Sequence, residues 1–195
     1  MVPPLCYRAG MVDGPLPLLV QVSGKPGSGK STLARALADR TALGLPLLSM
    51  DMVRRALEEP YRDSTLELDG RTGVEALYRL VDTFLVARLS LILELSFRRG
   101  LDEWRLQPLL ARARVVNVHC AAPEALARTR FLAREHLLAE AGARTYPAIA
   151  QAMQAGAFDW QVFDPLDLPV PRLLVDTGTP TYAPPLAEIV AFCRA

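Results

Sequence analysis

The chain has 195 residues, of which 51% are hydrophobic and 22% charged, and its formal net charge is +1. This length is most simply one domain with a substantial core. The near-neutral charge gives no reason to expect a nucleic acid or a membrane surface as partner. The longest apolar stretch, 89–97, contains Glu94 and is too short to span a membrane.

The first 16 residues contain several prolines and glycines, so we expect a flexible arm without a secretory signal, followed by a single domain over 17–195. Three widely scattered cysteines without metal-ligand spacing fit free thiols in a cytoplasmic protein. The domain opens with an apolar run at 17–22, which predicts a buried parallel strand. Residues 31–40 have the spacing of an amphipathic helix.

Between this strand and helix lies a glycine-rich segment of the form G-x-x-x-x-G-K-[ST]. In a strand–loop–helix arrangement, backbone N–H groups and a helix N-terminus converge on an anion. Of the 22 basic residues 20 are arginines, yet a lysine stands where this motif needs a compact ammonium group. The segment is therefore a predicted nucleotide-phosphate site, a P-loop. Its residues are Gly24, Lys25, Pro26, Gly27, Ser28, Gly29, Lys30, Ser31 and Thr32.

The rest of the chain alternates between strands and helices. Strands are predicted at 45–49, 89–95, 115–119 and 173–175, and helices at 51–57, 73–88, 123–138, 147–155 and 186–192, with an irregular segment at 61–72. This alternation predicts an α/β fold with a five-stranded parallel sheet covered on both faces. Ligands of such sheets bind at the carboxyl ends of the strands, which directs attention to the acids there.

These segments resemble the small P-loop kinases of the bacterial group that includes zeta toxins, chloramphenicol phosphotransferase and gluconate kinase. The resemblance spans most of 17–195 and rests on the P-loop, on residues 49–54 and 94–99, and on the arginine-bearing helix after Pro123. It implies a three-layer α/β/α P-loop NTPase fold like that of nucleoside and shikimate kinases, with a helical lid at about 123–156. It also implies ATP and Mg²⁺ as cofactors.

Within the P-loop, Lys30 would contact the β- and γ-phosphates, the Ser31 hydroxyl would bind Mg²⁺, and Thr32 would lie by the α-phosphate. Asp51, at the end of the second strand, could accept or orient the proton of an attacking hydroxyl. An acid at this position is the usual candidate in the kinases that the chain resembles. Asp51 could instead be the N-cap of the helix that starts there.

Glu94 interrupts an apolar run, where a charged group is costly to bury without a partner. It could orient a magnesium-bound water or the substrate hydroxyl, and many members of the resembling group have Asp here. The alternative is an ion pair with Arg98 or Arg99. Arg54 and Arg55 could hold an anionic or polar substrate, or could be one solvated side chain and one member of an ion pair.

Arg130 and Arg134 are i, i+4 neighbours on the predicted helix 123–138. The resemblance implies that they stabilise the transferring phosphate when the lid closes, with Arg128 and Arg144 as further candidates. The alternative is a solvent-facing stripe opposite an apolar face of Leu126, Ala133 and Leu137. By analogy, the loop 177–180 is expected near adenine.

The favoured function is an ATP- and Mg²⁺-dependent kinase that phosphorylates a hydroxyl of a small molecule (a sugar, a nucleoside or nucleotide, or an antibiotic-like compound), as a monomer or homodimer. A GTPase is disfavoured because the only asparagine is Asn117, which excludes the N-K-x-D guanine-reading motif. A toxin-like or nucleic-acid-end kinase stays open, although the many interspersed acids argue against a polynucleotide substrate. A nucleotide-binding ATPase without a small-molecule acceptor also stays open.

Overall fold

The computed structural model describes residues 14–58, 70–143 and 145–195. Its centre is a five-stranded sheet in the order β2–β3–β1–β4–β5, and every pair of neighbouring strands is parallel. The expected parallel sheet is therefore confirmed. The strands are β1 (Leu18–Gly24), β2 (Leu47–Ser49), β3 (Leu91–Glu94), β4 (Arg114–Ala121) and β5 (Arg172–Asp176).

Helices follow each strand in the described ranges. They are α1 (Lys30–Ala38), α2 (Met50–Glu58), α3 (Gly70–Val86), α4 (Glu103–Leu106), α5 (Glu124–Glu140), α6 (Pro147–Gln154) and α7 (Leu186–Arg194), with 3-10 helices at Gln107–Ala111 and Gln161–Phe163. The sequence did not predict α4 or either 3-10 helix. Residues 70–72, expected to be irregular, belong to α3, and the rest of the segment 61–72 lies outside the described residues, as do residues 1–13 of the expected arm.

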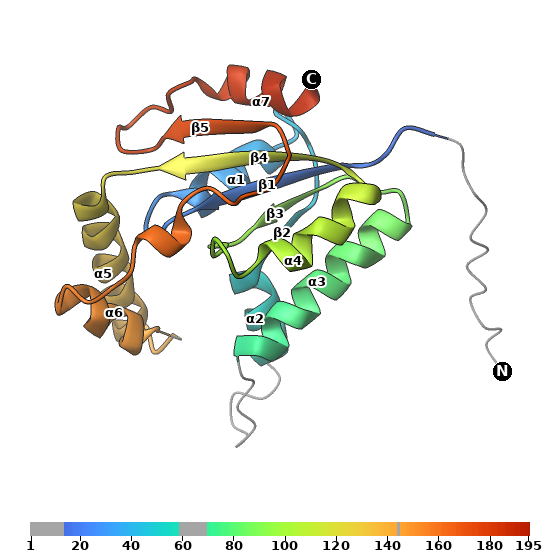
Figure 1. Cartoon of the computed structure of the whole chain (residues 1–195). Coiled ribbons are helices and arrows are strands. Elements are labelled where there is room, and N and C mark those ends of the chain that lie inside the picture. The colour runs from blue at the N-terminus through green and yellow to red at the C-terminus, as the bar shows by residue number, and fades with distance from the viewer. Residues whose placement is uncertain (1–13, 59–69, 144) are drawn as a thin grey trace, which may run out of the picture.

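Alternation along the strands divides the core between the two faces of the sheet. Leu19 of β1 and Leu91 and Leu93 of β3 pack with α3 and α4 on one face. Val20 and Val22 of β1 pack with α1 and α7 on the other. The result is the expected three-layer α/β/α fold, in which the sheet lies between α1 with α7 and α3 with α4 (Figure 1).

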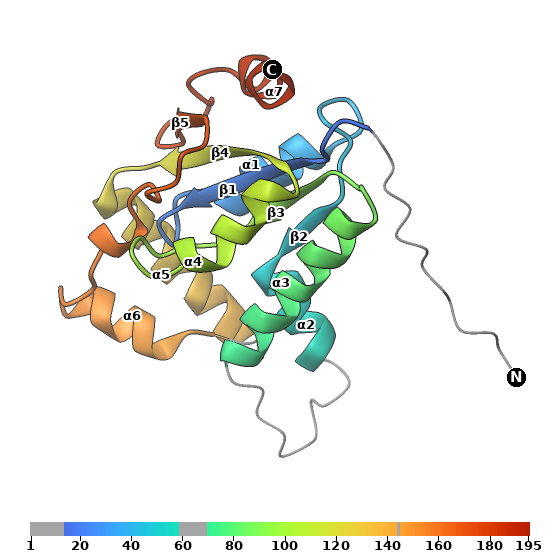
Figure 2. The same ribbon diagram turned by 45° about the vertical axis from the view of Figure 1, so that its right-hand side comes forward.

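One end of the sheet gathers the elements on which the predicted site depends. The register pairs Ser49 with Glu94 and Glu94 with Val22, so β2, β3 and β1 reach this edge together. The helices α5 and α6 lie beyond these carboxyl ends, and α2 starts there (Figure 1, Figure 2). None of the helices in the described part of the chain has the length and apolarity that crossing a membrane would require.

Candidate active site

The P-loop runs from the end of β1 to the start of α1, as its sequence predicts, and two of its glycines could not carry a side chain. Gly27 has φ 80°, and a Cβ there would lie 2.0 Å from the carbonyl oxygen of Ala127 in α5. A Cβ on Gly24 would lie 2.6 Å from the carbonyl oxygen of Cys120 in β4. The loop is thus wound tightly and packed directly against backbone of two neighbouring elements.

Lys30 is the first residue of α1, and its side chain is buried. Its ammonium group donates a hydrogen bond to the carbonyl oxygen of Lys25 at 2.9 Å, so the side chain folds back over the loop. Burial lowers the pKa of Lys30, while the negative charges of Glu94 and Asp51 oppose that effect. A bound anion would add to the negative charge that these two carboxylates bring to the buried ammonium group.

The rest of the loop is held in place by contacts with its surroundings. Lys25 pairs with Glu124 at the start of α5 (2.8 Å). The hydroxyl of Thr177, after β5, donates to the carbonyl oxygen of Ser28 at 2.6 Å. The Ser28 hydroxyl itself is buried and has no hydrogen-bond partner in the described part of the chain. An anion in the loop would give it one, so the residues present fit a bound phosphate.

Glu94 is 7% exposed at the end of β3. Burial raises its pKa, and the nearby charge of Lys30 and the hydroxyl of Ser31 lower it. The alternative ion pair of Glu94 with Arg98 or Arg99 is not found among the described residues, and Arg98 pairs with Asp102 instead. The described residues contain no cluster of three or more His, Cys, Asp or Glu side chains that could hold a metal ion. One hydroxyl and one carboxylate nevertheless fit Mg²⁺, which is commonly held by one or two carboxylates together with substrate phosphates.

Asp51 lies in the first turn of α2 and is exposed. It is not the residue that caps this helix, because the Ser49 hydroxyl accepts the Met52 N–H at 3.3 Å. Its charge acts on both Lys30 and Glu94. Lys30 at the start of α1, Asp51 at the start of α2 and Glu94 at the end of β3 therefore all lie at the carboxyl ends of the strands.

Tyr146, between α5 and α6, contacts Asp51 from the opposite side of the site. Its hydroxyl donates to Asp51 at 3.3 Å and accepts from Arg54 at 2.8 Å. The Arg54 guanidinium also lies over the Tyr146 ring, 5.4 Å from its centre, and the Tyr146 N–H donates to Glu135 of α5. Sequence reasoning did not find Tyr146, since a single tyrosine before a proline has no distinguishing pattern.

The two predicted lid arginines have different surroundings. Arg130 donates to the carbonyl oxygen of Thr177 at 2.8 Å, which ties α5 to the segment after β5. Arg134 lies over the Phe131 ring at 5.1 Å and pairs with Glu135 at 3.5 Å, and its charge contributes to the lowered pKa of Lys30. Arg128 instead reaches the carbonyl oxygen of Gln154 in α6. Arg144 lies outside the described residues.

The prediction that Leu126, Ala133 and Leu137 form the apolar face of α5 is wrong. Leu137 is 65% exposed and Ala133 is exposed. The buried residues of α5 are Ala127, Phe131 and Glu135. The helix has only a weak apolar stripe because it packs on the P-loop near its start and on the segment around Tyr146 further along, not along one continuous core.

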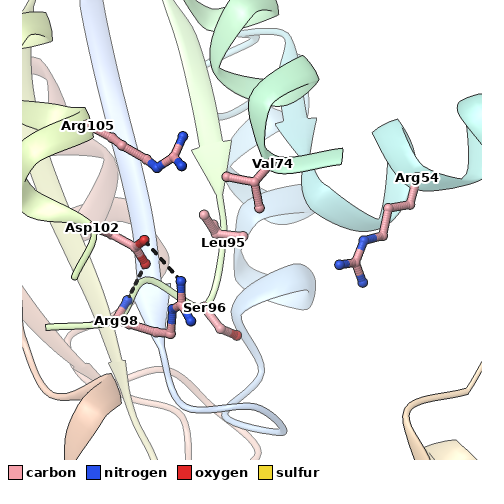
Figure 3. A pocket seen from close by; sticks show the side chains of 7 residues that line it. All are labelled: Arg54, Val74, Leu95, Ser96, Arg98, Asp102 and Arg105. Carbon is pink, nitrogen blue, oxygen red and sulfur yellow. Dashed lines mark hydrogen bonds and ion pairs between the residues drawn. The ribbon is translucent and has the colours of Figure 1, made fainter. Parts of the chain in front are cut away.

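A pocket of about 540 Å³ lies beside Glu94. Leu95 and Ser96, which directly follow Glu94, form part of its lining (Figure 3). Arg54 is the predicted substrate-binding residue that reaches it, whereas Arg55 is exposed and is not among the lining residues. The complete lining is Arg54, Val74, Leu95, Ser96, Arg98, Asp102 and Arg105.

Comparison with known proteins shows the family to which the chain belongs. The family model described as "AAA domain" matches residues 19–155. A candidate kinase from Chloroflexus aurantiacus j-10-fl has a solved structure that is 30% identical, with a TM-score of 0.72, and the match covers 92% of this chain and 97% of that one.

Two further solved structures are similar at lower identity, which shows the fold alone. A sugar kinase from Janibacter sp. HTCC2649 is 21% identical, with a TM-score of 0.54 over 89% of this chain and 91% of that one. The APS kinase of Mycobacterium tuberculosis, solved with AMPPNP and APS, is 20% identical, with a TM-score of 0.51 over 91% and 95%. No match was found among curated proteins. Since the family model spans well over half of the residues, this chain belongs to the AAA-domain family and has the P-loop fold of its kinase-like, phosphotransferase members.

Proposed function

We propose that this protein is an ATP- and Mg²⁺-dependent kinase that transfers the γ-phosphate of ATP to a hydroxyl group of a small molecule, such as a sugar, a nucleoside or nucleotide, or an antibiotic-like compound. The observation that carries the proposal is the meeting of Lys30, Asp51 and Glu94 at one edge of the sheet, next to a pocket. Phosphoryl transfer needs mainly positioning and charge stabilisation, which this arrangement offers.

Each residue has a role that follows from its position. The loop 24–32 would hold the phosphates through its N–H groups, and Lys30 would neutralise their charge. Ser31 and Glu94 would hold Mg²⁺, which when bound neutralises charge on the phosphate oxygens. Asp51 would take the proton of the acceptor hydroxyl, and Arg134 would face the transferring phosphate.

The pocket beside Glu94 supports a small-molecule kinase over a simple ATPase and over a nucleic-acid-end kinase. A nucleotide-binding ATPase without an acceptor would not need a pocket of about 540 Å³ lined by the two residues that follow Glu94. A volume of this size lies within the range typical of small-molecule sites. It favours a compact acceptor over the end of a polynucleotide, which would need an extended basic channel.

The proposal is tested by comparing Lys30→Ala with the wild-type protein. In an ATP-consumption screen over panels of nucleosides, sugars and antibiotics, the wild type should turn over at least one acceptor, and Lys30→Ala should lose this turnover while keeping its circular dichroism spectrum. Arg40→Ala removes an exposed cation beyond the far end of α1 and should behave like the wild type. Turnover of ATP by Lys30→Ala at the wild-type rate would end the proposal.

A further inference from the structure

The pocket beside Glu94 has an unusual charge. Three guanidinium groups line it, from Arg54 in α2, Arg98 after β3 and Arg105 in α4, against the single carboxylate of Asp102. Figure 3 shows the three arginine side chains entering the same hollow from different elements, with Arg54 on one side and Arg98 and Arg105 on the other. Cations brought together in this way repel one another unless something neutralises them.

Asp102 neutralises only part of this charge, because one carboxylate faces three guanidinium groups. Its Oδ2 accepts the backbone N–H of Arg98 at 2.6 Å, and its Oδ1 lies 3.7 Å from the Arg98 guanidinium. The carboxylate thus mainly fixes the turn that follows β3. The Arg98 side chain is 54% exposed, so most of its donors are available to a ligand.

Arg54 likewise has no carboxylate partner among residues 14–58, 70–143 and 145–195. Its hydrogen bond goes to the uncharged hydroxyl of Tyr146, and in the described ranges no carboxylate lies within ion-pair distance of it. Its guanidinium is held in place by the Tyr146 ring. A pre-positioned cation facing a hollow can bind an anion at little cost in side-chain entropy.

Arg105 sits at the back of the pocket and is the best fixed of the three. Its guanidinium pairs with Glu75 at 3.1 Å and lies over the rings of Trp104 (4.5 Å) and Tyr78 (5.6 Å). Glu75 is itself half exposed, so this pair neutralises the pocket only in part. The net charge of the lining therefore stays positive.

From this geometry we infer that the acceptor carries an oxyanion, a carboxylate or a phosphate ester, and that Arg98 and Arg54 bind this group while a hydroxyl of the same molecule is presented to Asp51 and Glu94. The inference rests on the proposed function, since it names the class of molecule that occupies the acceptor site. Guanidinium groups match the planar, two-pronged geometry of both oxyanions. Leu95 and Ser96 line the pocket and directly follow Glu94 in the chain, which places the anion site next to the end of β3.

The test measures acceptor binding without turnover, by isothermal titration calorimetry on protein saturated with ADP and Mg²⁺ so that the P-loop is occupied. The ligands are matched sets: glucose, gluconate and glucose 6-phosphate, and glycerol, glycerate and glycerol 3-phosphate. At least one anionic member should bind tenfold or more tightly than its neutral counterpart, because one charge-assisted hydrogen bond contributes about a factor of ten or more. Comparing the carboxylate with the phosphate ester in each set shows which of the two anionic groups the pocket binds.

Two variants locate the effect in this pocket. Arg98→Gln should reduce the preference for the anionic member at least tenfold, while Arg99→Gln, which removes the same charge from the next, exposed position outside the lining, should keep it. Equal binding within every set, no binding of any anionic member, or an unchanged preference in Arg98→Gln would each overturn the inference. Selective anion binding by a protein that never transfers phosphate from ATP would instead contradict the proposed function and retain the anion site.

Discussion

Individual side chains at the edge of the sheet divide their tasks between structure and chemistry. Ser49 caps α2, which leaves the Asp51 carboxylate free of a backbone role. The Asp51 carboxylate accepts a hydrogen bond from the Tyr146 hydroxyl at 3.3 Å, a long contact that a substrate hydroxyl could replace. An exposed acid in the first turn of a helix also lies in the favourable field of the helix N-terminus.

Asp51→Asn should therefore lower kcat by on the order of 10²-fold or more, the scale of general acid–base catalysis, because an amide cannot accept the proton of the acceptor. Steady-state kinetics together with ATP titrations should show that the affinity for ATP is nearly unchanged. Asp39→Asn is the matched control, since Asp39 is exposed after α1 and binds Thr41. An Asp51→Asn enzyme with the full wild-type rate would leave Asp51 without a catalytic role.

At the scale of elements, the segment between α5 and α6 is joined to α2 across the site. Tyr146 contacts Asp51 and Arg54 on α2, and its own N–H is held by Glu135 on α5. Through this one residue the segment between α5 and α6 touches both the proposed base and a proposed anion-binding arginine. The position of α5 and α6 is thus coupled to the residues that would hold the acceptor.

Tyr146→Phe keeps the ring under Arg54 and removes only the hydroxyl. We expect kcat to fall roughly 2- to 10-fold, the effect of losing one or two modest hydrogen bonds, and the KM for ATP to stay near the wild-type value. Acceptor-saturated initial rates measure the first quantity and ATP titrations the second. Tyr182→Phe, in the apolar core next to α7, is the control for loss of a tyrosine hydroxyl. A change confined to the KM for ATP would contradict this account of Tyr146.

The sequence predicted an element or site well when one continuous segment of the chain encodes it, and poorly when residues far apart in the chain form it. The P-loop, β1 and α1 lie within one continuous segment, and their positions agree with the prediction. Arg98 and Arg105 were not assigned to the substrate site, because they follow β3 whereas Arg54 follows β2. Only the pairing of these two strands in the sheet brings the three arginines to one pocket. The helix α4 escaped prediction for a simpler reason: four residues are too few to show a helical period.

On the scale of the whole molecule, a cluster of three buried polar side chains joins β1 to β4 on the face of the sheet that carries α3 and α4. The Ser23 hydroxyl lies 3.0 Å from the His119 Nδ1 and accepts the Asn117 side-chain amide at 3.0 Å. Burial, with a smaller contribution from the charge of Arg172, lowers the pKa of His119 to about 4. The imidazole is therefore neutral in the folded protein near pH 7.

The stability of the fold should consequently depend on pH through His119. The folded-state pKa lies below the unfolded value of 6.5, so the unfolded chain binds the proton first, and stability is lost as the pH falls from about 6.5 towards 4. Between pH 7.5 and 4.5 the wild type should lose roughly 2–3 kcal/mol more unfolding free energy than His119→Gln. Urea denaturation at both pH values measures this difference. Parallel losses in the two proteins would show that His119 does not titrate in this way.

The residues of the proposed donor site and of the proposed acceptor site come from different halves of the sheet. The P-loop and its supports belong to β1, β4, β5 and α5, whereas the arginine pocket belongs to α2, α3 and the segment from β3 to α4. Glu94 stands at the boundary between them. In a protein divided in this way, substitutions in the arginine pocket can change the substrate specificity while the P-loop stays the same. Proteins with nearly identical sequences around Lys30 can therefore differ in substrate.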